Sequence, residues 1–573
     1  MNPSTYLLFL LLTFVTNIQA IFDPQVCKSN TTNIDDSFPK LDPQYSVFIE
    51  ANYISNKSTV HFTEYHDTSK GANVIKRSQQ DSKTDVYLFQ STGEMFTVSQ
   101  DGACRITDLW KKPNKYLFGE EISNGRFFSL AGAIELAETN FFKVKEKTTV
   151  IDRGVSTSVW SACQYLPSMK ATVTTTWYFA TEDSVPVTPV RLHMKGKDSD
   201  GEALEYQFEF FHYKPYILTE KPIFETPRGT VCNGRKQTKP LPDFPDVFSC
   251  TTEIVNEAQN KIQYQEEEYD TINQLVRFTY KPVLGSEDSF GTGKLTKIHD
   301  YNIDVAYIID DIRGNCTMQA IFGNDDDIRG DHNQHMATAK EIFKVDKGIF
   351  TYEGVQSIRG YDCDVWVAHI DTYPTFPLMT GSIIEWYFIT RQWYYGKTAH
   401  GVPKLMIQTD LTSHEVEEKN IYNFRETEPD ILLFDVTTCF EFRDKYKFIF
   451  TIPVKHTQLI ERHLKSFKRG IVNAIIDNIQ ISPMRINQIN VEFVKNKISA
   501  SFEIHDVVTV PNSGALTKKQ ISLKKAVDEL ESIFTKGAFT VPFKYGDQQI
   551  IMIDADNNSL TKEEVKGTHK SNN

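Results

Sequence analysis

One stretch, DADNNSLTKEE, has residue types and spacing close to those of a calcium-binding loop. Asp554, Asp556 and Asn558 stand at the first, third and fifth ligand positions of an EF-hand loop. The sixth position needs glycine for its turn but holds Ser559, and the twelfth needs a bidentate glutamate but holds Val565. We therefore expect no metal here and assign residues 554–573 to a polar tail.

A second polar stretch, NDDDIRGDHNQH at 324–335, combines acidic residues with His332 and His335. Two histidines three residues apart can bind a metal when they lie on a helix. Gly330 indicates a loop instead, and no third ligand is fixed by the pattern. We predict a solvated insertion without a metal.

Two pairs of carboxylates recur at the same spacing, Glu50 with Asp67 and Glu253 with Asp270. Paired carboxylates perform glycoside hydrolysis. These pairs fall on adjacent strands of a predicted hairpin, where cross-strand polar pairs are a simpler explanation. The sequence also lacks G-x-S-x-G, H-E-x-x-H, Walker and G-x-G-x-x-G motifs. We expect no catalytic residues, no cofactor and no enzymatic activity.

The N-terminus, MNPSTYLLFLLLTFVTNIQA, predicts a secretory signal peptide over residues 1–20. In an oxidising compartment an even number of cysteines without zinc spacing indicates disulfides. The candidates are the eight cysteines Cys27, Cys104, Cys163, Cys232, Cys250, Cys316, Cys363 and Cys439. The sequons at Asn30, Asn56, Asn315 and Asn557 are candidate glycosylation sites in the same compartment.

The net charge of −13 without a basic stripe argues against a nucleic-acid partner. After the signal peptide no stretch is apolar enough to span a bilayer, so we expect a secreted chain without a transmembrane anchor.

The elements that would position these residues occur twice. Trp177-Tyr178-Phe179 returns as Trp386-Tyr387-Phe388, in a chain with six tryptophans. Further landmarks match in the same order: the two carboxylate pairs, a cysteine (Cys104 and Cys316), Phe-Gly, Arg-Gly and Val-Trp. We infer a tandem duplication and, from the matched positions, favour the disulfides Cys316–Cys363 and Cys104–Cys163. We expect the repeated tryptophans to be core residues, although a ligand groove would use the same side chains.

Within each copy, β-branched and aromatic residues alternate with polar ones, which predicts antiparallel strands with one buried face. The patterns GAIELAETNFFKV and MATAKEIFKVD favour one helix per copy, although the first segment is also compatible with an extended strand.

This order of motifs resembles a family of metazoan extracellular proteins with tandem LolA-like domains. The resemblance implies two open, curved β half-barrels, each crossed by a helix. In the bacterial namesake the concave face carries lipid acyl chains.

The remainder of the chain follows a different pattern. The strand KYKFIFTIP precedes a helix from Thr457, the strands INQINVEFV and KISASFEIHDVV, and a helix that stops at Gly537. GAFTVPF or QQIIMI supplies the last strand, which completes a βαββαβ, ferredoxin-like order. Extracellular SEA modules share this order, but the turn VKNKIS lacks their Gly-Ser cleavage site.

The predicted fold is therefore mainly β with α+β: two tandem open LolA-like half-barrels followed by a ferredoxin-like domain. The expected divisions are a signal peptide 1–20, an extension 21–37, half-barrels 38–198 and 240–412, linkers 199–239 and 413–440, the α+β domain 441–553 and the tail 554–573. Our first hypothesis is a secreted, non-enzymatic protein that binds lipid or another apolar ligand in its concave faces. The alternative is an extracellular protein that binds a protein partner and has filled half-barrels. An undetected hydrolase is the least favoured.

Overall fold

The computed structural model describes residues 23, 25–26, 38–79, 82–109, 118–122, 125–139, 150–166, 169–181, 187–218, 223–282, 290–321, 325–330, 334–346, 348–371, 381–390, 401–440, 443–494, 497–508, 510, 517–546 and 549–567. The chain forms two compact units, residues 1–240 with 351–360, and residues 241–350 with 361–573. The predicted signal peptide, Cys27, Asn30 and His332 lie outside the described residues.

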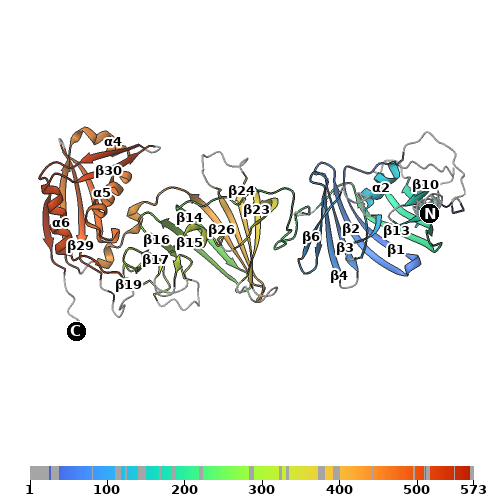
Figure 1. Cartoon of the computed structure of the whole chain (residues 1–573), viewed down its shortest axis with the longest axis horizontal. Coiled ribbons are helices and arrows are strands. Elements are labelled where there is room, and N and C mark those ends of the chain that lie inside the picture. The colour runs from blue at the N-terminus through green and yellow to red at the C-terminus, as the bar shows by residue number, and fades with distance from the viewer. Residues whose placement is uncertain are drawn as a thin grey trace, which may run out of the picture. The chain divides into compact units, whose positions relative to one another are not determined.

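The first unit is built on one antiparallel sheet in the order β6-β5-β4-β3-β2-β1-β13-β12-β11-β10-β9 (Figure 1). Its strands are β1 (Gln44–Tyr53), β2 (Ser58–Asp67), β3 (Ala72–Gln79), β4 (Ser82–Phe89), β5 (Glu94–Ser99), β6 (Cys104–Asp108), β9 (Val150–Asp152), β10 (Val155–Leu166), β11 (Ala171–Ala180), β12 (Pro189–Asp198) and β13 (Ala203–Lys214). The other elements are η1 (Ile54–Asn56), the hairpin β7 (Phe118–Ile122) and β8 (Gly125–Phe128), α2 (Leu130–Thr139) and β22 (Thr351–Ile358).

Buried and partly exposed residues alternate strictly along β1, which shows which face of this sheet is buried. Tyr45, Val47, Ile49, Ala51 and Tyr53 are buried, while the residues between them are partly exposed. Successive side chains of a strand point to opposite faces, so these five define one face, which we call the inner face.

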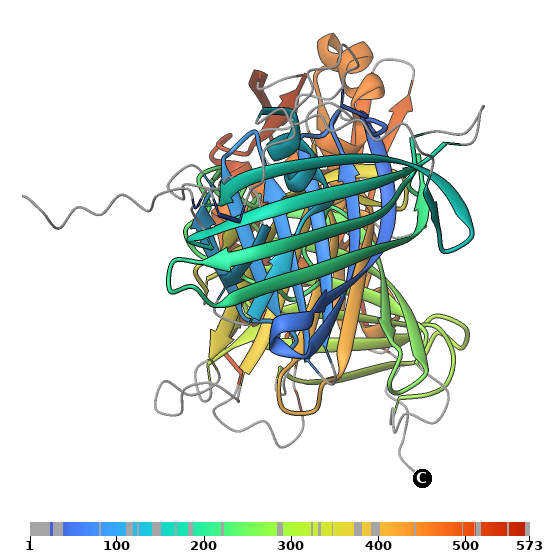
Figure 2. The same ribbon diagram turned by 90° about the vertical axis from the view of Figure 1, so that its right-hand side faces the viewer.

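The first sheet curls around its inner face. One hydrophobic cluster joins residues of β1–β4 to residues of β10–β13 and includes Phe127, Phe128 and Leu130. Strands so far apart in the sheet share a cluster only if the sheet bends around it. Figure 2 shows the green strands β10–β13 running at a steep angle to the blue strands of the same sheet. The predicted half-barrel architecture is confirmed.

The predicted linker 199–239 is wrong, because it contains β13. This strand pairs with β1 along its length, with Ala51 opposite Phe208 and Tyr53 opposite Tyr206. It therefore lies in the middle of the sheet. Its alternating pattern, ALEYQFEFFHYK, carries the signal of a half-buried strand.

The second unit contains the second large antiparallel sheet, in the order β19-β18-β17-β16-β15-β14-β26-β25-β24-β23. Its strands are β14 (Val247–Asn256), β15 (Lys261–Asp270), β16 (Leu275–Tyr280), β17 (Leu295–Asp300), β18 (Val305–Asp310), β19 (Cys316–Ala320), β23 (Tyr361–Asp371), β24 (Gly381–Ile389), β25 (Pro403–Asp410) and β26 (Val416–Arg425). The short elements are β20 (Ile328–Arg329), β21 (His335–Met336), α3 (Ala339–Ile342), η2 (Ile431–Phe434) and η3 (Thr437–Phe440).

This sheet has the strand order of the first one. In each, a hairpin (β1–β2 or β14–β15) is paired on its other side with the last strand of the sheet, β13 or β26. The predicted linker 413–440 is wrong for the same reason, because β26 pairs with β14. A helix follows the sheet's first six strands in each copy, as predicted, but α3 is a single turn.

The second unit also contains the C-terminal module. Its elements are β27 (Lys445–Ile452), η4 (Val454–His456), α4 (Thr457–Arg462), α5 (Leu464–Ile479), η5 (Pro483–Arg485), β28 (Ile486–Val494), β29 (Lys497–His505), α6 (Leu523–Thr535), β30 (Thr540–Tyr545), β31 (Gln549–Asp554) and β32 (Thr561–Val565). The sheet order β28-β29-β27-β32 is that of a βαββαβ fold.

The last strand of this sheet lies where the sequence predicted a polar tail. β32 pairs with β27, with Lys562 opposite Phe448. The two segments expected to supply the strand, β30 and β31, instead form a separate hairpin. β32 was missed because its sequence, TKEEV, is almost fully exposed and carries no apolar alternation.

The module packs on the outer face of the second sheet. One cluster joins Leu275, Ile298, Val305 and Tyr307 of the sheet to η2, η3 and the module's core. Two buried polar contacts cross the same boundary, from Arg469 to Asp270 and from Ser482 to Asp300. The second sheet and the module therefore form one packed body.

Candidate functional site

A buried carboxylate, Glu64, holds the helix that fills the first half-barrel. Its side chain has no exposed surface and lies on β2 opposite Val47 of the inner face. It accepts hydrogen bonds from five donors: Tyr45 Oη (3.0 Å), Asn73 Nδ2 (3.1 Å), Ser129 Oγ (3.1 Å) and the backbone N–H groups of Leu130 (2.5 Å) and Ala131 (3.0 Å). A carboxylate at a helix N-terminus satisfies its unpaired N–H groups and complements its dipole.

Burial raises the pKa of Glu64, and the N–H groups of Ala131 and Leu130 oppose that rise by favouring the ionised form. The sheet thus holds α2 through one buried carboxyl group in an apolar interior.

The segment held by Glu64 packs against aromatic side chains of the inner face. Phe127 packs on Phe62 of β2, and Phe128 stacks on Phe208 of β13 with a centroid distance of 4.0 Å. Leu130, Ala133 and Ile134 of α2 belong to the same cluster. We call Phe127, Phe128, Leu130, Ala133 and Ile134 the plug. The plug covers the inner face in this structure.

The repeated tryptophans are core residues, as predicted. Trp177 and Trp386 are 4% and 0% exposed. Each lies opposite the tryptophan of the matched Val-Trp pair, Trp160 or Trp366. Phe38 packs against Trp177, and Phe343 against Trp386, so both rings meet a filled interior.

The equivalent carboxylate in the second half-barrel has a different partner. Glu267 lies on β15 opposite Cys250, as Glu64 lies opposite Val47. It forms an ion pair with Lys419 (3.1 Å) and accepts a hydrogen bond from Thr252 (2.7 Å). Burial lowers the pKa of Lys419 and the Glu267 carboxylate raises it, with a net rise. This carboxylate is neutralised by a side chain of β26, and no N–H group of a helix in the described residues hydrogen-bonds to it.

The predicted carboxylate pairs are not brought together. Asp67 lies at the far end of the hairpin from Glu50, which faces His61. Six residues of strand place the two roughly 20 Å apart. Asp67 binds the turn through Ser69 and Lys70, and Asp270 binds Asn273 in the same way. Glu253 accepts a hydrogen bond from Asn420.

In the calcium-like loop, both aspartates accept hydrogen bonds from threonine side chains of the module. Asp554 accepts a hydrogen bond from Thr540, and Asp556 accepts one from Thr451 (2.7 Å). Asn558 is exposed in the turn with a φ of 56°. In the acidic stretch, the exposed His335 lies on β21, whereas Asp325 and Asp327 meet His299 of β17 instead.

The favoured disulfide pairings are wrong. The structure contains Cys104–Cys232 and Cys316–Cys439. Cys163 is disulfide-bonded but not to Cys104, and Cys363 is buried on β23. Cys250 is a buried thiol, and burial together with Glu267 raises its pKa.

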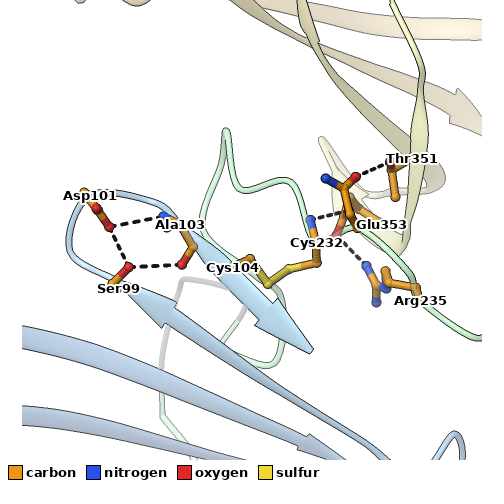
Figure 3. The surroundings of a disulfide bond; sticks show 9 residues. Ser99, Asp101, Ala103, Cys104, Cys232, Arg235, Thr351 and Glu353 are labelled. Atoms are coloured by element: carbon orange, nitrogen blue, oxygen red, sulfur yellow. Dashed lines mark hydrogen bonds and ion pairs between the residues drawn. A yellow bond between two sulfur atoms is a disulfide. The ribbon is translucent and has the colours of Figure 1, made fainter. Parts of the chain in front are cut away.

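The two disulfides are equivalent. Each joins the first residue of an edge strand, β6 or β19, to the segment that follows the last strand of its sheet. That segment covers the outer face of its sheet, through Phe224 and Cys232 in the first unit and through Phe434 and Phe440 in the second. Figure 3 shows Cys104 on β6 and Glu353, which accepts hydrogen bonds from the Cys232 N–H and from Arg235. The prediction missed these pairs because it treated the covering segments as linkers.

Three of the four sequon asparagines, Asn56, Asn315 and Asn557, are described, and all three are exposed. Among the described helices, none combines the length and apolar character needed to cross a membrane.

Comparison with known proteins identifies two segments. Residues 227–440 match the model of the metazoan second LolA-like domain, and residues 445–564 match a domain of unknown function, DUF7959. A search of curated proteins found no significant match. Among solved structures, the crystal structure of CghA with Sch210972 aligns over 67% of this chain and 89% of that chain, at 6% identity and a TM-score of 0.09, which is too low to support an argument. The second half-barrel is thus similar to metazoan LolA-like domains.

Proposed function

We propose that this chain is a secreted protein whose first half-barrel binds a lipid acyl chain or a similar apolar ligand on its inner face. The match of residues 227–440 to a LolA-like domain supports apolar binding by this architecture. The shared strand order and the equivalent disulfides support treating the first sheet as another copy of that domain. The disulfides and the exposed sequons support secretion.

The observation that carries the proposal is the plug. In the first half-barrel an apolar inner wall is covered by a helix that the sheet holds through Glu64. A ligand would take the place of Phe127, Phe128, Leu130 and Ile134. Exposing these four side chains costs about 6–12 kcal/mol, at about 1.5–3 kcal/mol each. Burying an acyl chain of about 14 methylenes returns about 11 kcal/mol. The exchange is nearly balanced, which suits reversible binding.

The test measures binding of a fluorescent fatty acid to the delipidated full-length protein and to Glu64→Gln. The amide offers fewer and weaker acceptors to α2, and hydrogen bonds to a charged group contribute about 1.5–3 kcal/mol each. Loosening the plug raises the population of the open form, and apparent affinity rises with that population. We expect Glu64→Gln to bind roughly tenfold more tightly.

Glu267→Gln is the matched control, because it makes the same change at the equivalent position where no helix is held. It should leave the affinity unchanged when folding is verified by circular dichroism. If neither the parent protein nor Glu64→Gln binds the probe, and native mass spectrometry finds no lipid, the proposal fails and the protein-interaction hypothesis remains.

A further inference from the structure

The second half-barrel carries a polar cluster that the proposed lipid site does not use. His299 of β17 meets Asp325 and Asp327, which lie between β19 and β20. His299 and Asp327 are almost completely buried, and the Asp325 side chain is 40% exposed. The cluster thus has two fixed members and one that faces solvent.

Hydrogen bonds fix the orientation of His299. Its Nδ1 lies 2.6 Å from Asp327 Oδ2, which also accepts a hydrogen bond from Tyr301 Oη at 2.8 Å. With the proton on Nδ1, the lone pair is on Nε2, and Nε2 lies 3.7 Å from Asp325 Oδ2. A carboxylate that orients a histidine through its other nitrogen is the usual support of a histidine metal ligand.

Two buried polar atoms beside this histidine have no hydrogen-bond partner within the described part of the chain, Asp327 Oδ1 and Tyr269 Oη. Tyr269 is 1% exposed, and it lies on the face of His299, since Tyr269 is opposite Val276 and Val276 is opposite His299. Its hydroxyl interacts electrostatically with Asp327. Buried groups of this kind call for a ligand, an ion or a bound water.

We propose that His299 Nε2 and the Asp325 carboxylate bind a divalent transition metal such as Zn²⁺, while Asp327 orients His299 through Nδ1 and water completes the coordination. Tetrahedral ligands at about 2.1 Å from zinc lie about 3.4 Å apart, so Nε2 and Asp325 Oδ2 need to approach by only a few tenths of an ångström. Asp327 Oδ2 lies at Nδ1, on the other side of the ring, so the unpartnered Asp327 Oδ1 does not ligate the metal but accepts a hydrogen bond from metal-bound water. The bound ion fastens the chain between β19 and β20 to the sheet.

A lysine competes for the same carboxylate. Lys297 Nζ lies 3.0 Å from Asp325 Oδ2, and its side chain is 19% exposed. Bound metal displaces this ammonium group toward solvent. Removing the ammonium should therefore tighten metal binding, whereas adventitious binding at surface carboxylates would not respond.

The test titrates the full-length protein with Co²⁺, followed by its visible absorption bands, and with Zn²⁺ in competition. We expect one ion per chain at this site. Asp325→Asn should weaken binding by at least about tenfold, as should His299→Gln. Lys297→Met should tighten binding by about tenfold, because an ammonium group near a divalent ion is repelled even in water.

The control uses an exposed ion pair of the same half-barrel, Lys340 with Asp243 at 3.1 Å. Lys340→Met and Asp243→Asn should leave Co²⁺ binding unchanged. Asp325 and Lys297 reach solvent, so their variants test the site even if His299→Gln fails to fold. The proposal is overturned if the parent protein binds no Co²⁺, or if Asp325→Asn and Lys297→Met bind it like the parent.

Discussion

Arg469 of α5 joins the C-terminal module to the second half-barrel, and its replacement by methionine tests whether the two are one cooperative body. The guanidinium group, on a residue 8% exposed, binds Asp270 Oδ2 at 2.7 Å, the Pro429 carbonyl at 2.7 Å and Glu428 at 3.2 Å. Arg469→Met keeps most of the aliphatic stem and removes all three contacts.

The expected loss of stability arises because Arg469→Met leaves the buried Asp270 carboxylate without its ion-pair partner. Asp270 is fully buried, and removing one partner of a buried ion pair costs about 3–5 kcal/mol. Asn273 still donates two hydrogen bonds to Asp270, at 3.0 Å and 2.8 Å. We therefore place the cost at the low end, about 3 kcal/mol. Lys465→Met on the same helix is the control, because the Lys465–Asp430 pair has a lysine that is 81% exposed and should contribute less than about 1 kcal/mol.

Hydrogen exchange with mass spectrometry measures the loss of stability in individual segments of the chain. Protection of α5 and of residues 431–440 should fall by roughly 100-fold in Arg469→Met, while peptides of β1–β6 in the first unit serve as the internal reference. A double-mutant cycle with Asp270→Asn should give a coupling of about 2 kcal/mol. The reasoning is refuted if Arg469→Met behaves like Lys465→Met or if the coupling is zero.

Three further predictions concern other parts of the chain. Burial lowers the pKa of His505 to about 3, so the folded state keeps a neutral imidazole, and stability should fall by about 2 kcal/mol from pH 7 to pH 5; denaturation of His505→Phe should lack this decline. Peptide mapping without reduction should recover both disulfides described above and Cys250 as a thiol, whereas a Cys104–Cys163 peptide would contradict the structure. Gly470→Ala should destabilise the module by more than about 1 kcal/mol despite alanine's helix propensity, because the added Cβ would lie 2.3 Å from the Pro542 carbonyl oxygen. Thermal unfolding measures the effect, and an unchanged or higher Tm would contradict the prediction.

The repeated strands were predictable because their signals are local. Trp177 and Trp386 sit in alternating β-branched and aromatic segments, and such patterns predict half-buried strands directly. The α5 and α6 helices were predictable for the same reason, since their buried residues recur at helical spacing.

The missed features depend on contacts between distant residues. Glu64 looks like any exposed strand glutamate until α2 is placed over it, and His299 belongs to no motif in the sequence. The disulfide pairing also depends on distant contacts. Eight cysteines allow many pairings, and the true partners lie in segments that the sequence predicts to be linkers. The repeat itself held an unused clue: Cys232 and Cys439 occupy corresponding places after the two sheets.

The equivalent disulfides also bear on how the chain is made. An open sheet has an edge strand with unpaired backbone groups, which invites association with other chains. β6 and β19 are such edges, and each is tied to a segment that follows it by more than a hundred residues, at separations of 128 and 123. During synthesis the first cysteine of each pair therefore waits as a thiol until the rest of its sheet has emerged. Oxidation before that point can only produce a wrong pair, so the timing of oxidation, and access to disulfide isomerase, should decide how much of this protein folds correctly.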